Sequence, residues 1–305
     1  MTNESRLAHP FSLSELIDVS NLHIGLPMWF MSGWRGQLLG KKTTTADALS
    51  EYSRVFSTVE GNTTFYGLPR EQRLNAWLSM ASEDFRFCFK LPREISHAQN
   101  LLRAAAKAVE LDIFLQRLGG RLGVLMIQLP ASFSPSRIRE LAELIDYLRA
   151  RTSAAIAVEV RHPDFFRKDD NERMLLRLLA DHGADRVIFD SRGLMADDST
   201  DDAVLEAQGK KPKLPVHPIA TAGNPVVRFI GHSDWQKNEK YLLQWQQKIV
   251  QWCKEGKQCW FFVHTASNQD APEFARWIMD VWGTKHKSWP GQVDPDPVND
   301  LFSGL

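Results

Sequence analysis

The chain has 305 residues, of which 43% are hydrophobic and 24% charged, the proportions of an ordinary soluble globular protein. Its 37 basic residues balance 37 acidic ones, and this zero net charge disfavours a protein that coats nucleic acid or an anionic membrane through bulk charge. No run approaches the roughly 20 apolar residues that span a bilayer, and the first residues lack the positive-then-apolar order of a secretory signal.

Eight short apolar runs follow one another along the chain, about 30 to 40 residues apart, a spacing that suits strand–helix units. Several are nearly continuous in Val, Ile, Phe and Met, as strands covered on both faces are. The predicted strands are 22–29, 55–60, 85–90, 123–128, 155–160, 186–190, 226–230 and 259–264.

Apolar residues between these runs recur with helical spacing, as Leu141, Ile145 and Leu148 do. Eight strands that alternate with helices predict an α/β fold, a closed parallel (β/α)8 TIM barrel. An open doubly wound sheet is the alternative, but no glycine-rich phosphate turn follows the first strand.

Two segments do not fit the repeat. Residues 191–225 form a long connection after the sixth strand, with an acidic stretch followed by Lys210, Lys211 and Lys213. So long a connection is often functional or mobile. The C-terminus is rich in proline and aspartate, as flexible tails are. The expected organisation is an N-terminal extension at 1–20, a TIM-barrel domain at 21–284 and a flexible tail at 285–305.

The three cysteines bear on the cellular compartment. Cys88, Cys253 and Cys259 are odd in number and show no CxxC spacing, which argues against a disulfide scaffold and a cysteine-rich zinc module. Cys88 and Cys259 lie in apolar runs, so we expect buried free thiols. Free thiols are typical of reducing compartments, and we expect a cytoplasmic protein with no membrane partner.

Polar residues lie at the end of seven of the eight predicted strands, or within two residues of it, where a TIM barrel carries its active site. The residue two positions earlier is mostly small or apolar, which predicts a filled barrel with a polar mouth. Burying so many ionisable groups together is costly, so the cluster predicts a ligand site. The strand-end residues are Glu60, Lys90, Gln128, Glu159, Asp190, Arg228 and His264. Further candidates for binding are Trp29, Asn62, His97, Arg161, His162, Arg192 and His232.

Seven stretches form a recognisable set: VEGNTTFYGLP (59–69), FRFCFKLPREISH (85–97), QLPASF (128–133), VEVRHPDFF (158–166), DSR (190–192), RFIG (228–231) and FVHT (262–265). In this order they resemble the domain-of-unknown-function 72 family, in particular its YecE-like bacterial branch. The resemblance implies a TIM barrel without an established activity. It also implies a presumptive site at Glu60, Asn62, Lys90, His97, Gln128, Glu159, Arg161, His162, Asp190, Arg192 and Arg228.

The first functional hypothesis is an enzyme that acts on a small anionic substrate, such as a sugar phosphate or nucleotide. Lys90, Arg161 and Arg228 would hold its phosphate or carboxylate. The general acid and base would be Glu60 and Glu159, and proton relay would fall to His97 or His264. In a variant of this hypothesis, Lys90 forms a Schiff base.

Three other classes remain open. A metal-dependent hydrolase or isomerase would use ligands from Glu60, Glu159, Asp190, His232 and His264, although Lys90 and Arg228 would repel a divalent ion. A nucleic-acid-associated protein would contact phosphates through residues 210–213. Its tail residues Asp300, Leu301 and Phe302 resemble the peptide with which replication and repair proteins bind the DNA sliding clamp. A non-catalytic binding barrel is the fourth class. No particular cofactor is implied.

Overall fold

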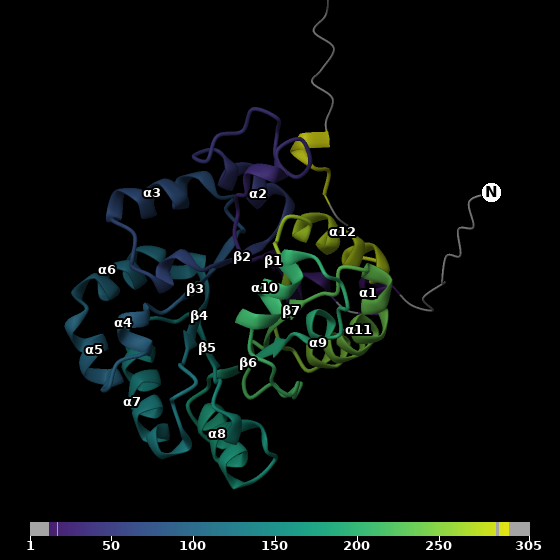
Figure 1. Ribbon diagram of the computed structural model, residues 1–305. Helices are drawn as coiled ribbons and strands as arrows, with labels where there is room; N and C mark the ends of the chain where they lie inside the picture. Colours follow the sequence, from purple (N-terminus) through teal and green to yellow (C-terminus); the bar gives the residue numbers. More distant parts are fainter. Residues whose placement is uncertain (1–11, 17, 285–286, 293–305) are drawn as a thin grey trace, which may run out of the picture.

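The computed structural model describes residues 12–16, 18–284 and 287–292. Eight parallel strands pair in chain order, and the last strand pairs with the first to close a barrel (Figure 1). The predicted TIM barrel is therefore confirmed. The strands are β1 (Leu22–Leu26), β2 (Thr58–Gly61), β3 (Arg86–Lys90), β4 (Leu122–Gln128), β5 (Ala155–Glu159), β6 (Asp185–Asp190), β7 (Val226–Ile230) and β8 (Cys259–His264).

The first two strands differ from their predicted bounds. The apolar run from 22 to 29 ends as a strand at Leu26, because Pro27 has no backbone N–H to donate to a neighbouring strand. The run from 55 to 60 pairs only from Thr58, because Val55 ends the preceding helix.

Helices surround the barrel (Figure 1). Their apolar stripes face the sheet, and Leu141, Ile145 and Leu148 are all fully buried. Short 3-10 turns complete the connections. The helices are α1 (Leu13–Leu16), α2 (Ala48–Val55), α3 (Glu71–Met80), α4 (Arg93–Ser96), α5 (Leu101–Lys107), α6 (Val109–Leu118), α7 (Ile138–Arg149), α8 (Asp170–Asp181), α9 (Arg192–Met195), α10 (Asp202–Lys210), α11 (Glu239–Lys254) and α12 (Ala271–Val281).

Side chains fill the barrel below its mouth. The inward-facing residues form one buried apolar cluster, made of Cys88, Val124, Met126, Ala157, Val187, Val226, Trp260 and Phe262. Such filling makes the barrel a packed core rather than a pore, so any ligand must bind at its mouth.

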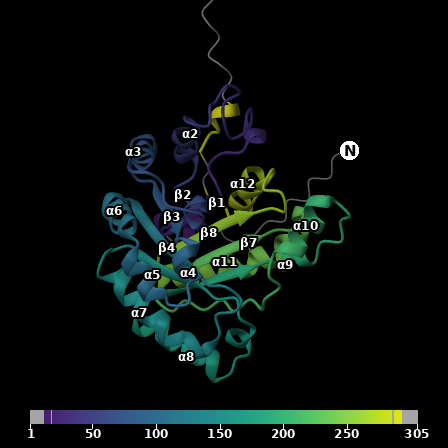
Figure 2. The same cartoon turned by 60° about the vertical axis from the view of Figure 1, so that its left-hand side comes forward.

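The long connection after β6 is ordered and reaches the mouth. Figure 2 shows its helices α9 and α10 beyond the carboxyl end of β7. The last residues of the connection are held at the amino end of β6. There the buried side chain of Asp185 accepts hydrogen bonds from the backbone N–H groups of Ala222 and Asn224. The connection is thereby held as a cover on one side of the barrel mouth.

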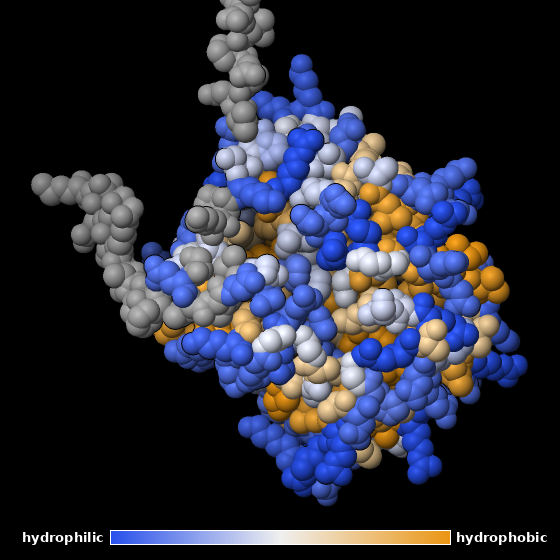
Figure 3. Space-filling view, turned by 180° about the vertical axis from the view of Figure 1, so that it is seen from behind, coloured by the Kyte–Doolittle hydropathy of each residue, from blue (hydrophilic) through white to orange (hydrophobic). Residues whose placement is uncertain are grey.

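The face of the molecule that lies behind the view of Figure 1 is hydrophilic surface interrupted by separate apolar patches (Figure 3). Within the described ranges, none of the helices has both the length and the apolar character to cross a membrane. The three cysteines are free and buried, as expected, although Cys253 and Cys259 lie close, with their sulfur atoms 3.8 Å apart.

Candidate functional site

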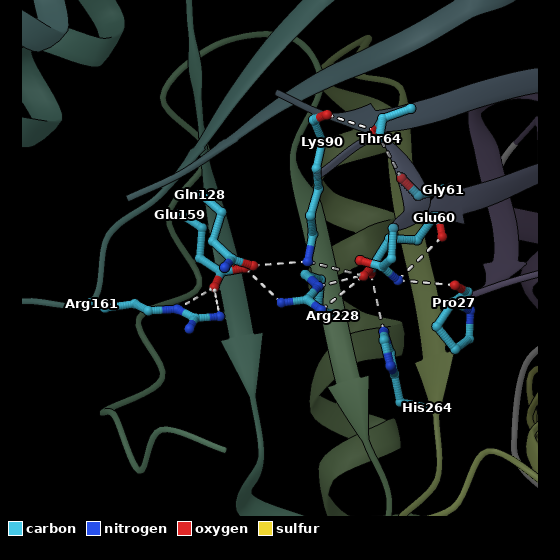
Figure 4. Close-up of polar contacts among 11 residues, drawn as sticks. Pro27, Glu60, Gly61, Thr64, Lys90, Gln128, Glu159, Arg161, Arg228 and His264 are labelled. Atoms are coloured by element: carbon cyan, nitrogen blue, oxygen red, sulfur yellow. Dashed lines mark hydrogen bonds and ion pairs between the residues drawn. The ribbon is translucent and has the colours of Figure 1, made fainter. Parts of the chain in front are cut away.

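A ring of polar side chains closes the top of the filled barrel. Each comes from the carboxyl end of a different strand and is at most 6% exposed. We call these residues the polar ring: Glu60, Lys90, Gln128, Glu159, Arg228 and His264 (Figure 4). Six strand ends converge here because the strands of a parallel barrel all point toward one face.

Arg228 lies at the centre of the ring, between two carboxylates (Figure 4). Its Nε and Nη2 donate to the two oxygens of Glu60, both at 2.8 Å, and its Nη1 donates to Glu159 Oε2 at 2.6 Å. The other oxygen of Glu159 accepts from Arg161 Nε at 2.8 Å. Bidentate pairing of this kind fixes the guanidinium in position and keeps all three groups charged.

Lys90 reaches the ring from β3. Its Nζ donates to Gln128 Oε1 at 2.8 Å and lies 3.6 Å from Glu60 Oε1. Glu60 Oε2 also accepts a hydrogen bond from His264 Nε2 at 3.1 Å. Because the carboxylate is ionised and only accepts, it selects the histidine tautomer with the proton on Nε2 and a lone pair on Nδ1.

The two carboxylates remain ionised. Burial by itself would raise the pKa of Glu60, but the nearby Arg228, His264 and Lys90 hold that pKa well below its usual range. In the same way, Arg228, Arg161 and Lys90 overcome burial and lower the pKa of Glu159 to about 2. Neither carboxyl therefore carries a proton to donate at neutral pH.

Two other ring groups have pKa values below their usual range. Burial, together with the charge of Arg228, lowers the pKa of Lys90 to about 8. Burial also lowers the pKa of His264 to about 4, although Glu60 acts in the opposite direction. At neutral pH His264 is therefore an uncharged base, while Lys90 is mostly protonated and close to its point of titration.

A cavity of about 600 Å³ lies above the ring, and we call it the anion cavity. Its lining includes Lys90, Arg161 and Arg228 from the strand ends. Lys211, at the end of α10, joins them from the long connection. Burial and the charge of Arg228 lower the pKa of Lys211, so this side chain experiences the same field.

The charges around the anion cavity do not cancel. Five cationic side chains line it, and three carboxylates oppose them, Glu206 in the lining and Glu60 and Glu159 in the polar ring. The cations are Lys90, Arg161, Lys210, Lys211 and Arg228. Lys211 takes part in none of the ion pairs found among the described residues of the cavity lining. An excess of two positive charges in a recess with low-dielectric walls attracts anions.

Residues 23–299 match the family described as "Protein of unknown function DUF72". The chain belongs to this family. It is 38% identical over 269 residues to the UPF0759 protein YecE of Escherichia coli K12, a match that covers 88% of this chain and 94% of that protein. The resemblance found in the sequence motifs is therefore confirmed.

Solved structures of the DUF72 family share the fold. A DUF72 family protein from Thermotoga maritima aligns with a TM-score of 0.60 at 21% identity, covering 85% of this chain and 98% of that one. Another, from Enterococcus faecalis, aligns with a TM-score of 0.65 at 18% identity, covering 91% of this chain and 100% of that one. At these identities the matches show a common architecture.

Asp190 and Arg192 do not join the ring, contrary to the expectation from the sequence. Asp190 points to the outside of the barrel, where it accepts from Trp245 Nε1 at 2.8 Å and pairs with Arg192. The residue of β6 that faces the cavity is Phe189, whose ring lies 5.1 Å from the Arg228 guanidinium. Side chains alternate along a strand, so an error of one residue exchanges the inner and outer faces.

The other predicted residues occupy different surroundings. Asn62 lines the anion cavity and donates to the Pro27 carbonyl at 2.9 Å. His97 stands outside the cavity lining, edge-on to Phe65. His162 accepts from the backbone N–H of Asp164 and so caps the following 3-10 turn. Trp29 packs against Trp77 in a neighbouring groove.

The proposed metal ligands are not brought together. Arg228 occupies the space between Glu60 and Glu159, Asp190 points away, and His232 lies buried beside Asp197. In the described part of the chain, the one cluster with metal-ligand spacing is Asp197, Asp198 and His232. The Asp197 oxygens already accept from the backbone N–H groups of Ser199 and Ser233, so this cluster ties two loops together.

Two predictions of nucleic-acid contact concern residues 210–213 and the C-terminal tail. Lys210 and Lys211 both line the anion cavity, and Lys210 also pairs with Glu206 on the same helix. Contact between residues 210–213 and nucleic acid stays a prediction. Asp300, Leu301 and Phe302, the residues that resemble a clamp-binding peptide, lie outside the described residues.

Proposed function

We propose that this protein is an enzyme of the cytoplasm that binds a small phosphate- or carboxylate-bearing substrate in the anion cavity. The observation that carries the proposal is the excess of two positive charges at the mouth of the barrel, where five cations face three carboxylates. Glu60 and Glu159 engage three of the five N–H groups of Arg228, so we assign anion contact chiefly to Lys90, Arg161 and Lys211.

His264 would supply the chemistry, as a general base. Its Nε2–H is engaged by Glu60, which leaves Nδ1 to accept a proton from the bound substrate. The low pKa of Glu60 and Glu159 assigns them a different role from the acid–base pair expected from the sequence. Both act as positioning residues, Glu60 for His264 and Arg228, and Glu159 for Arg161 and Arg228. A protonated Lys90 would stabilise negative charge that develops on the substrate.

A thermal-shift panel tests the binding claim. The panel holds inorganic phosphate, sugar phosphates, nucleotides and dicarboxylates, and a ligand at 100 times its Kd stabilises the folded state by about 2.7 kcal/mol. We expect at least one anion to raise the melting temperature. Lys211→Met should abolish that rise, whereas Lys213→Met should preserve it, because Lys213 is exposed and lies outside the cavity lining.

The role of His264 has its own test. Once an anionic substrate is known, His264→Asn should lower kcat and leave the Kd of that substrate nearly unchanged. The reason is that His264 accepts a proton from the substrate, whereas the cations of the cavity bind its negative charge. A panel without any shift, or a shift that survives Lys211→Met, contradicts the anion site. Full turnover by His264→Asn contradicts the assigned base.

A further inference from the structure

An apolar groove adjoins the anion cavity. It lies between α2 and α3 beside the loop that follows β1, on the side of the barrel where α2 and α3 are labelled in Figure 1. Aromatic and aliphatic side chains dominate its walls, among them Trp29, Phe30, Leu49, Trp77 and Met80. Arg73 alone is charged among the described residues that line it. Its volume of about 850 Å³ falls within the usual range for small-molecule sites.

The groove and the anion cavity share one wall. Pro27, Met28, Asn62 and Tyr66 line both. The wall is ordered, because the Asn62 amide donates to the Pro27 and Glu60 carbonyls at 2.9 and 3.4 Å. A ligand anchored in the cavity therefore needs only to cross this shared wall, which we call the ridge, to reach the groove.

Tyr66 marks the junction. Its side chain is 85% exposed although it stands beside apolar surface on the groove side. Trp29, Phe30 and Trp77 are likewise only partly buried. Contiguous exposed aromatic surface of this kind is costly in water and typically marks a place where an apolar partner binds.

We propose that the ligand is an amphipathic anion. Its phosphate or carboxylate would sit among Lys90, Arg161 and Lys211, and an alkyl or aromatic portion would cross the ridge at Tyr66 into the apolar groove. This inference rests on the proposed function, because the anion cavity must first hold the charged end. It narrows the substrate class from small hydrophilic anions to anions that carry a hydrophobic extension.

A chain-length series tests the inference by titration calorimetry. The probes are inorganic phosphate and the monophosphates of ethanol, butanol and hexanol, with free hexanol as the probe that lacks the anion. Once the chain reaches the groove, each methylene should tighten binding roughly fourfold, which corresponds to about 0.8 kcal/mol. Hexanol alone should bind at least 100-fold more weakly than hexyl phosphate, an order-of-magnitude expectation for the loss of several charge-assisted hydrogen bonds.

Matched variants show where the alkyl chain that tightens binding is held. Ala76 lines the groove on α3, whereas its neighbour Asn75 is exposed and outside the lining. Ala76→Phe should fill the groove and remove the chain-length dependence while leaving the affinity for inorganic phosphate unchanged. Asn75→Phe should keep the full dependence. If Ala76→Phe fails to fold, the series on the wild-type protein still decides.

The outcomes separate the two proposals. Tighter binding with each methylene, lost in Ala76→Phe, supports the inference. Phosphate binding that does not change with chain length, or a gain that persists in Ala76→Phe, overturns the inference and leaves the anion cavity in place. Failure of every member of the series to bind overturns the inference, and failure of the dicarboxylates in the thermal-shift panel as well overturns the proposed function.

Discussion

Arg228 is the most informative position for testing the electrostatics of the ring. Replacement by methionine keeps most of the apolar stem and removes the guanidinium. Glu60 then loses two hydrogen bonds of 2.8 Å, and Glu159 loses one of 2.6 Å. Both carboxylates are at most 2% exposed, so water cannot replace the lost partner. Removing one partner of a buried ion pair typically costs about 3–5 kcal/mol of unfolding free energy, and we expect a loss of that size near neutral pH.

The loss should depend on pH with a definite sign. In the wild-type protein the pKa of both carboxyls is depressed, so their contribution to stability is complete above about pH 4.5. The contribution of Glu159 is lost as pH falls through about 2. Arg228→Met removes the cation that opposes the effect of burial most strongly. Burial then raises the pKa of both carboxyls. Folding then takes up protons, and the deficit in stability should shrink between about pH 8 and about pH 5.

Urea unfolding of the wild-type protein and Arg228→Met at these two pH values measures the effect. Glu60→Gln in the Arg228→Met background should recover part of the loss, because it removes an unpaired buried charge. Arg186→Met is a matched control: Arg186 is equally buried, pairs with Glu172 at 2.6 Å and lies away from the anion cavity. It should destabilise the fold without changing the affinity for phosphate. A loss below about 1 kcal/mol in Arg228→Met, equal at both pH values, would refute the reasoning.

Three more predictions concern the ring and its support. The affinity for the anion, measured by calorimetric titration, should fall as pH rises through about 8, where Lys90 loses its proton. Lys90→Met should not show this fall in affinity, and an unchanged fall in the variant would assign the titration to another group. His264 should stay neutral with its proton on Nε2 from about pH 6 to about pH 9, because its pKa is about 4; a nitrogen NMR titration that shows charging in this range would contradict the ring geometry. Gly25→Ala should lower the urea midpoint by an amount that corresponds to about 1–3 kcal/mol of unfolding free energy, because the added Cβ would stand 2.3 Å from the Thr58 carbonyl oxygen. A midpoint equal to that of the wild-type protein would show that the backbone shifts to make room for the Cβ.

The architecture was predictable because its signal is repeated. Buried parallel strands require continuous apolar runs, and eight of them at regular spacing leave few alternatives to a closed barrel. The polar residues at the strand ends stand out against such runs, which is why Glu60, Lys90 and Arg228 could be found from the sequence. Their partners could not, since the pairing of Arg228 with both Glu60 and Glu159 depends on contacts across the barrel.

Two features of the site, the positions of Phe189 and Lys211, could not be predicted from the sequence pattern, each for a physical reason. Phe189 faces the cavity in place of Asp190, and the apolar run of β6 gives no sign of which of two adjacent residues points inward. Lys211 joins the cavity from α10, and its position follows from how the long connection packs, which no local pattern encodes. The length and basic end of that connection were the available signal.

The central claim is that Lys90, Arg161 and Lys211 form an oxyanion site at the mouth of the barrel. Crystals of the protein soaked with tungstate, an electron-dense analogue of phosphate, test it most directly through anomalous difference density. The account predicts a peak within hydrogen-bond distance of these three side chains, lost in Lys211→Met crystals. Peaks confined to the outer surface, with the anion cavity empty, would contradict it.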